Sequence, residues 1–300
     1  TCNRQDQALR SQERPALRNS IDKIEFKLGQ VFKYQIQRDT FYAPHGKDSY
    51  DLDLNVYTID GLYLTDDNFV KFNENTCELI GLAIDRKYLK DNEFSLVARD
   101  KINGLDESDA FVITITEPIN QDKYTFESSF GLSFESGDLN LDLDLDTKLD
   151  IANKISSKLF GDEDTRFLTI LKITKGRYIP ILKDDLKEND LSRNDLILRA
   201  KRTTGLATTY YKFVWTNSSN PLLAYGNQCP SHAIQETIHK QLFGREGGFE
   251  EIEEAFKPKY RLIFVAFNAT KKCSSSLSPN VIYKDNLEPI FVTSEGEEEV

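Results

Sequence analysis

The sequence predicts two domains of different class, an all-β sandwich followed by an α+β domain. Its length of 300 residues suits about two domains. Short strands without helical periodicity fill residues 20–118, whereas strands and helical patterns alternate from about residue 122 onward. With 39% hydrophobic and 29% charged residues, the chain can bury a core in each domain.

The first domain is preceded by residues 1–19, which are polar and aperiodic and are predicted to form a tail or linker. Turn residues such as Asp60-Gly61 and Asn103-Gly104 then separate the strands. About seven strands in about 100 residues indicate a β-sandwich. The clearest strands alternate apolar with polar residues or are rich in β-branched ones, and they cover residues 31–36, 50–57, 94–98 and 110–116.

The second domain is predicted over residues 122–285, with a charged insert at about 183–207. Its elements follow in the order β-α-β-β-α-β, with a second short helix before the last strand. That order is typical of a ferredoxin-like antiparallel sheet with helices on one face. Strands are expected at 138–146, 167–174 (followed by 178–182), 208–215 and 261–267, and helices at 149–160, 230–242 and 249–256.

The final stretch, residues 286–300, is rich in glutamate and is predicted to be an acidic, flexible stalk. The net charge of -11 argues against nucleic acid and anionic membrane surfaces as partners. The chain contains no Met, as expected for a piece excised from a longer precursor. Asn217 and Asn268 begin glycosylation acceptor sequences, and the four cysteines are even in number. These features favour an oxidising, extracellular setting.

No enzymatic site, cofactor or metal site is expected. The only histidines, His45, His232 and His239, form neither a zinc triplet nor a Ser-His-Asp order. The alternating aspartates at 142, 144 and 146 are expected on the solvated face of a strand, about 7 Å apart, rather than around calcium. Trp215 is expected to pack in the core rather than to stack on a sugar.

Collinear motifs run through both predicted domains. They include Asp39-Thr-Phe-Tyr42 and Asp109-Ala-Phe-Val-Ile113 in the first domain, and Ile173-Thr-Lys-Gly176 and Val214-Trp-Thr-Asn217 in the second. Over about residues 15–300 the chain resembles the membrane-proximal ectodomain of the dystroglycan family. Further matching stretches are 15–22, 29–32, 70–73, 81–82, 98–105, 160–162, Cys229-Pro230 and Cys273.

The resemblance implies a cadherin-like or Ig-like sandwich followed by an SEA-like domain, with a transmembrane helix just after Val300. It implies an adhesion receptor on the extracellular side of the plasma membrane. Such a receptor binds laminin-type matrix proteins and reaches dystrophin and actin through regions outside this sequence. This part would couple the outer and membrane-spanning subunits. The alternatives are a secreted glycan-binding or matrix-binding module, and a calcium-dependent adhesion domain in which Asp100 and Asp109 occupy cadherin-like positions.

Proteolytic processing is the one chemistry that the family implies. Its SEA-like domains cut themselves at a Gly-Ser bond, which requires a strained peptide and a hydroxyl nucleophile. The corresponding position here is Thr209-Tyr210, which has no suitable nucleophile, so no self-cleavage is expected. Upstream, Arg199-Ala-Lys-Arg202 fits the pattern that furin-type proteases cut. Its alternative interpretation is a solvated basic strand end.

The cysteines divide into two pairs. A bridge between Cys229 and Cys273, both in matching stretches, would tie the loop before the second helix to the last strand. It would contribute roughly 4 kcal/mol in the chain-entropy model, and the alternative is two free thiols. For Cys2 two alternatives stay open: a bridge to Cys77, or an unpaired or intermolecular thiol.

Overall fold

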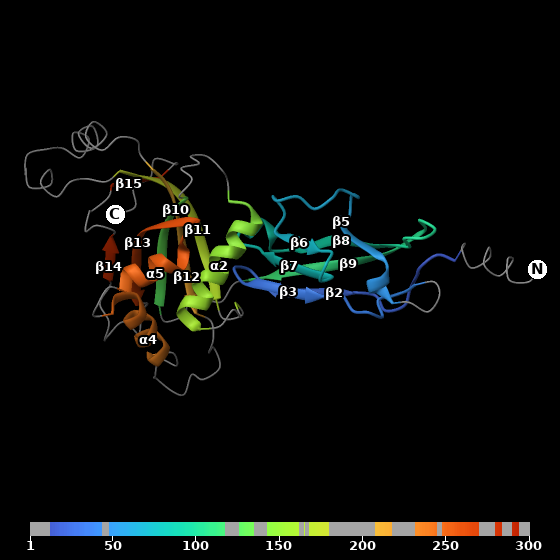
Figure 1. The fold of residues 1–300 in the computed structure, drawn as a ribbon, viewed down its shortest axis with the longest axis horizontal. Helices are drawn as coiled ribbons and strands as arrows, with labels where there is room; N and C mark the ends of the chain where they lie inside the picture. Colours follow the sequence, from blue (N-terminus) through green and yellow to red (C-terminus); the bar gives the residue numbers. More distant parts are fainter. Residues whose placement is uncertain are drawn as a thin grey trace, which may run out of the picture. The chain divides into compact units, whose positions relative to one another are not determined.

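The computed structural model describes residues 13–43, 48–117, 126–134, 143–161, 165, 168–179, 208–217, 232–244, 248–269, 280–283 and 290–293 (Figure 1). The chain divides into two compact units. One comprises Thr1–Pro118 with Asp144–Leu149, and the other comprises Ile119–Leu143 with Asp150–Val300. None of the described helices is long and apolar enough to cross a bilayer.

The first unit is a sandwich of two sheets. A four-stranded sheet has the order β2-β9-β8-β5, and a three-stranded sheet has the order β3-β7-β6. Strands β2 and β9 pair in parallel, and the other neighbours pair antiparallel. The bounds are β2 (Lys23–Lys27), β3 (Val31–Gln35), β5 (Asp53–Thr58), β6 (Val70–Asn73), β7 (Glu78–Leu82), β8 (Asp91–Arg99) and β9 (Asp106–Thr116), with a small pair of β1 (Ala16–Leu17) and β4 (Phe41–Tyr42).

Period-two burial builds the core of this sandwich. Along β9 the side chains of Asp109, Phe111, Ile113 and Ile115 are buried, while those between them are more exposed. Phe111 stacks on Phe94 of β8 with ring centroids 5.8 Å apart. The strands expected at 31–36, 94–98 and 110–116 are therefore confirmed, because alternation marks a sheet with one face in the core. The strand expected at 50–57 begins only at Asp53, since Ser49–Asp51 forms a 3-10 helix.

The second unit contains a six-stranded antiparallel sheet with the order β14-β13-β10-β12-β11-β15. Two outer strands, β14 and β15, extend a central set of four. The bounds are β10 (Phe126–Phe134), β11 (Leu168–Ile179), β12 (Thr208–Asn217), β13 (Tyr260–Ala269), β14 (Asn280–Tyr283) and β15 (Ile290–Thr293). Strand β15 lies inside the stretch that the sequence assigns to a flexible stalk, so the sheet extends beyond residue 285.

Three helices cover one face of this sheet: α2 (Leu145–Phe160), α4 (His232–Phe243) and α5 (Gly248–Phe256) (Figure 1). Trp215 is fully buried on that face and is the centre of an aromatic cluster. Its ring lies 5.7 Å from Phe126, 5.8 Å from Phe130 and 6.0 Å from Phe160, measured between centroids. Trp215 is thus a core residue, as the sequence predicted.

The start of helix α2 differs from expectation. The strand predicted at 138–146 is wrong at its end, because helix α2 begins at Leu145. Asp144 accepts a hydrogen bond from the backbone N–H of Thr147 at 2.7 Å, which is an N-capping contact, and Asp146 lies in the first helical turn. A helix does not place these two carboxylates on one strand face. The residues of that alternation at 139–142 lie outside the described part of the chain.

A buried glutamine in this core has no partner among the described residues. Gln235 of α4 is fully buried, and neither atom of its side-chain amide has a hydrogen bond there. Burying an unpaired polar group costs about 1–3 kcal/mol. We therefore expect Gln235→Leu to raise the free energy of unfolding by about 1–2 kcal/mol. Urea titration of both chains would measure this, with the neighbouring Glu236→Leu as the control; a lower midpoint for Gln235→Leu would contradict it.

His239 of α4 gives the second unit a pH dependence. Its ring packs against Phe267 at 5.0 Å between centroids, and burial lowers its pKa below the usual value of 6.5. The unfolded chain therefore takes up the proton more readily than the folded one. Stability is fully present above about pH 6.5 and is lost as pH falls through the lower folded pKa. We expect His239→Phe to flatten the loss of thermal stability between about pH 7.5 and 5; an unchanged slope would contradict this.

Candidate functional site

Thr209-Tyr210, the position that the dystroglycan resemblance predicts for self-cleavage, lies inside an antiparallel ladder. In strand β12, Thr209 pairs with Arg177 and Tyr210 pairs with Gly176 of β11. The only described non-glycine residue with positive φ is Cys77. Neither residue of the peptide is therefore held in the left-handed strain that would help to break a bond.

The side chain of Tyr210 is also buried by its neighbours. Tyr210 is 3% exposed, in a cluster with Ile263 and Phe264 on the sheet face opposite the helices. Its ring covers Gly176, where an added Cβ would approach ring carbon Cε1 within 2.5 Å. The ring of Tyr210 is thus a packing element over a glycine.

Only some of the residues predicted for protease cleavage, disulfide bonds and glycosylation lie within the described part of the chain. Arg199, Lys201 and Arg202 lie outside the described residues, as do Cys2, Cys229 and Cys273. Both acceptor asparagines lie on strands: Asn217 ends β12 and is half-buried, and Asn268 is exposed within β13. The furin-type site, the Cys229–Cys273 bridge and the glycosylation of these asparagines stay predictions.

Cys77 lies in the first unit, is 8% exposed and has no disulfide partner among the described residues. Burial raises the pKa of this thiol. Its φ of 53° is left-handed, and it ends a turn in which the Asn73 side chain accepts hydrogen bonds from the backbone of Asn75 and Thr76. Because Cys2 lies outside the described residues, the bridge between Cys2 and Cys77 stays open.

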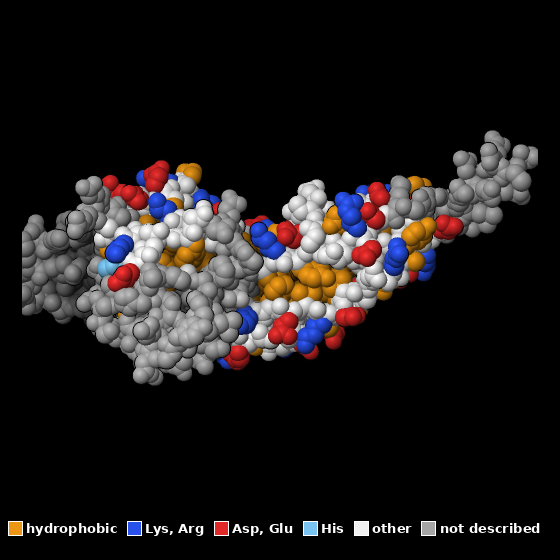
Figure 2. Space-filling view, turned by 90° about the horizontal axis from the view of Figure 1, so that it is seen from below, with side chains coloured by type: hydrophobic (Ala, Val, Ile, Leu, Met, Phe, Trp, Pro, Cys, Tyr) orange, Lys and Arg blue, Asp and Glu red, His pale blue; other side chains and the backbone are white. Residues whose placement is uncertain are grey.

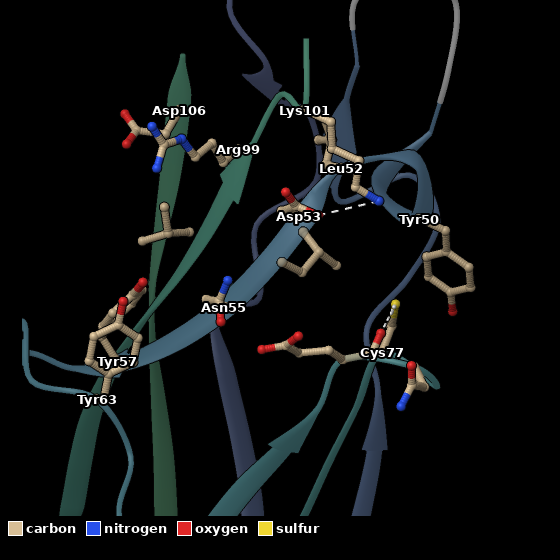
Figure 3. A pocket seen from close by; sticks show the side chains of 14 residues that line it. Tyr50, Leu52, Asp53, Asn55, Tyr57, Tyr63, Cys77, Arg99, Lys101 and Asp106 are labelled. Atoms are coloured by element: carbon tan, nitrogen blue, oxygen red, sulfur yellow. Dashed lines mark hydrogen bonds and ion pairs between the residues drawn. The ribbon is translucent and has the colours of Figure 1, made fainter. Parts of the chain in front are cut away.

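A polar groove of about 600 Å³ opens on the first unit (Figure 3). Its floor is the outer face of β5, where Asp53, Asn55 and Tyr57 point the same way because side chains alternate along a strand. Arg99 of β8 lies opposite Asp53 in register, and Asp106 of β9 lies opposite Arg99. Lys101 forms an ion pair with Asp53 at 3.3 Å, drawn as a dashed line in Figure 3.

Two tyrosines form one end of the groove. Tyr57 and Tyr63 have ring centroids 4.8 Å apart at an angle of 52°, and their backbones form an isolated antiparallel bridge. A hydrogen bond to Tyr63 raises the pKa of Tyr57, and partial burial contributes in the same direction. Tyr63 is 69% exposed, so its ring is held in place while facing solvent. Sequence patterns did not single out this groove, because its residues come from separate strands and turns.

The comparison with protein families assigns the first unit. Residues 11–116 match the family of the alpha-dystroglycan third Ig-like domain. The first unit is thus an Ig-like domain, dystroglycan-like in its sequence. This confirms the coarse fold expected for the first domain, and the described part of the chain is mostly β-sheet with few helices.

Among solved structures, the chain is similar to two proteins of other kinds. A titin domain M7 structure shares 12% identity at a TM-score of 0.25, covering 34% of this chain and 94% of that one. The endo-fucoidan hydrolase MfFcnA4 from glycoside hydrolase family 107 shares 15% identity at a TM-score of 0.28, covering 36% of this chain. The match spans 14% of the hydrolase chain. At these TM-scores the likeness adds nothing to the family match.

The aspartates of the Ig-like domain that suggested calcium have structural partners. Asp109 is 2% exposed and accepts hydrogen bonds from the Ser20 hydroxyl and the Ile21 N–H, both at 2.7 Å. Asp100 accepts one from the Ile102 N–H at 2.7 Å and begins the turn that Gly104 closes with a φ of 73°. Both carboxylates therefore hold backbone in place within the domain.

The face of the Ig-like domain shown in Figure 2 carries charges of both signs. Lys and Arg side chains alternate with Asp and Glu side chains around a strip of hydrophobic ones. An even mixture of signs produces no extended field of the kind that steers a polyanion to a surface. This face suits short-range recognition better than electrostatic capture.

Proposed function

We propose that this chain is the juxtamembrane extracellular part of a dystroglycan-like adhesion receptor, which couples the outer and membrane-spanning subunits. The observation that carries the proposal is the match of residues 11–116 to the dystroglycan Ig-like family. Two sequons and the absence of any predicted catalytic constellation agree with an extracellular, non-enzymatic role. The matrix-binding and dystrophin-binding regions of such a receptor lie outside this sequence.

The second unit is proposed to be SEA-like. Its central elements follow as β10-α2-β11-β12-α4-α5-β13, and its four central strands lie in the order β13-β10-β12-β11. In this order, one strand lies between the two strands that are connected through a helix: β12 lies between β10 and β11, and β10 lies between β12 and β13. It supports the ferredoxin-like class to which SEA domains belong.

Strand order explains how such a domain can couple two subunits. A cut in the connection between β11 and β12 would place β10, α2 and β11 in an N-terminal piece, and the later elements of this unit in a C-terminal piece. Strand β10 lies between β13 and β12, and β11 lies between β12 and β15. Both strands that the N-terminal piece contributes to this sheet, β10 and β11, thus have a strand of the C-terminal piece on each side. Separation would break every ladder of both strands at once.

The core crosses the same division. Trp215 belongs to the C-terminal piece, whereas Phe126, Phe130 and Phe160, which surround its ring, belong to the N-terminal piece. Dissociation would expose these buried rings to water, and apolar burial is the main driving force for such association. A chain cut in this connection is therefore expected to hold together without a covalent link.

A protease-site insertion tests this coupling. A recognition sequence for a site-specific protease, placed within residues 183–207, would allow the purified chain to be cut at one position. Size-exclusion chromatography should show both pieces eluting together in native buffer and apart in concentrated urea. Trp215→Ala should lower the urea concentration at which the pieces separate. Phe243→Ala, which removes a ring in contact with His239 within the C-terminal piece, should change it less. Separation in native buffer would contradict the proposal.

Self-cleavage is expected to remain absent even when the family residues are restored. We expect the double variant Thr209→Gly/Tyr210→Ser to stay a single chain, because this peptide lies in a paired strand without left-handed strain. Intact mass after prolonged incubation at neutral pH measures the outcome. Appearance of two fragments split between residues 209 and 210 would contradict the structural explanation.

Processing in trans and the receptor role need the full-length protein. Tags at both ends, surface labelling and co-purification of dystrophin would test the receptor assignment. A secreted, untethered product would support the alternative of a secreted module.

If a furin-type protease cuts at Arg199-Ala-Lys-Arg202, Arg202→Ala should convert two chains into one. A single chain in both proteins would contradict that processing.

A further inference from the structure

We infer that the polar groove of the Ig-like domain is a binding site for a neutral glycan chain. The inference stands apart from the coupling role of the second unit, because every lining residue belongs to the first unit. The groove's volume of about 600 Å³ falls within the range of about 300–1,000 Å³ found for small-ligand sites.

The tyrosine end supplies an apolar platform. A pyranose ring has one face of C–H bonds, and sugars commonly lay this face on an exposed aromatic ring. Tyr63 is 69% exposed, yet it is fixed against Tyr57 through ring contact and through the backbone bridge between the two residues. The loop between them closes with a hydrogen bond from the Thr58 N–H to the Leu62 carbonyl at 2.9 Å. A ring fixed in advance loses little entropy when a sugar binds.

The floor supplies hydrogen-bonding groups at regular spacing. Along β5, Asp53, Asn55 and Tyr57 repeat at about 7 Å, since alternate strand residues share a face. Figure 3 shows Asn55 between the tyrosine pair and the Asp53–Lys101 ion pair. A sugar hydroxyl both donates and accepts, so amide, carboxylate and ammonium groups can each pair with one. Planar and charged side chains lying side by side suit a polyhydroxylated ligand.

The charges of the lining favour a neutral ligand over an anionic one. Three carboxylates, Asp53, Glu74 and Asp106, face two cations, Arg99 and Lys101. Lys101 is already paired with Asp53, and the Nε of Arg99 donates to the Gly104 carbonyl at 3.1 Å. A sulfated or sialylated glycan would compete with Asp53 for Lys101 and approach the other two carboxylates. A neutral glycan meets no such repulsion.

A glycan array followed by titration tests this site with the purified 300-residue chain. The array should hold neutral oligosaccharides of mannose, galactose and glucose beside heparin-derived and sialylated ones. We expect a neutral oligosaccharide to bind with a Kd of about 1 mM or tighter. Its binding should change little with added salt, because no net charge is neutralised. In NMR spectra of labelled protein, the shifted resonances should map to the groove.

Matched variants separate this groove from other surfaces. Tyr63→Ala and Asn55→Ala should each weaken binding by about tenfold or more. Tyr42→Ala, which removes another exposed tyrosine (45% exposed, on β4), should leave it unchanged. Circular dichroism of each variant checks that the fold persists. The inference is overturned if only anionic glycans bind, if no neutral glycan binds at about 10 mM, or if Tyr63→Ala binds as well as the parent. None of these results affects association of the cut second unit.

Discussion

Replacing Asp109 by alanine should lower the free energy of unfolding of the Ig-like domain by about 2–4 kcal/mol. The carboxylate is 2% exposed and accepts hydrogen bonds from the Ser20 hydroxyl and the Ile21 N–H, each at 2.7 Å. Alanine would leave the buried N–H unpaired and release the segment that leads into β2. Because β2 pairs in parallel with β9, on which Asp109 lies, the loss should loosen this edge of the four-stranded sheet.

Hydrogen exchange followed by mass spectrometry can locate this effect within the whole chain. Peptides covering residues 13–43 and 91–117 should lose protection by about 30-fold or more, corresponding to about 2 kcal/mol. Asp22→Ala is the matched control, because it removes an exposed carboxylate from the same segment. A second readout is the pKa of Tyr34, which is raised by burial and, to a lesser extent, by the charge of Asp109. Equal protection in both variants would show that the two hydrogen bonds contribute little.

Gly81→Ala should destabilise the same domain by about 3 kcal/mol or more. Gly81 lies on β7, the central strand of the three-stranded sheet, where it pairs with both Phe32 and Val70. An added Cβ would lie 2.3 Å from Cζ of Phe32 and 2.5 Å from the carbonyl oxygen of Phe69. The first contact could be relieved by moving a ring. The second is with backbone, so the strand itself would have to shift.

Two other glycines provide a graded control for this substitution. Gly61 has a φ of 78° and no atom within 4 Å of an added Cβ, so Gly61→Ala should cost only the left-handed penalty of about 1 kcal/mol. Gly131 lies on β10 of the second unit, where an added Cβ would meet only the Phe264 side chain, so Gly131→Ala should destabilise that unit by an intermediate amount if this ring moves. Denaturant midpoints of the three variants measure the order. A Gly81→Ala midpoint close to that of Gly61→Ala would show that the strand can shift without a further loss of stability.

Alternation predicted most of the strands because one face of each is in a core. Strand β10 was missed, although Phe126, Phe130 and Leu132 occupy alternate positions and are buried. The serines and Gly131 between them weaken the apolar signal, and their smallness has a tertiary reason. Gly131 lies under the Phe264 ring, and the Ser128 hydroxyl donates to the Ala266 carbonyl at 2.6 Å. The groups that these positions accommodate lie on β13, more than a hundred residues away in the sequence.

The start of α2 illustrates the opposite error. Aspartate and leucine alternate up to residue 146, which has the period of a strand, yet Leu145 and Leu149 are buried on one face of a helix. Asp144 caps this helix, and an aspartate before an apolar helical pattern is a start signal that alternation concealed. Local periodicity alone could not decide between the two states.

The sequence by itself determined the β-sandwich class of the first domain, the buried role of Trp215 and the identity of Thr209 and Tyr210. These depend on local periodicity and residue identity, which a single chain displays directly. Only the tertiary structure decided the strand order that interlocks the two sides of the β11–β12 connection, and only it assembled the groove around Asn55, Tyr57 and Tyr63. Strand neighbours and groove walls come from residues distant in sequence, and long-range packing rather than local preference places them together.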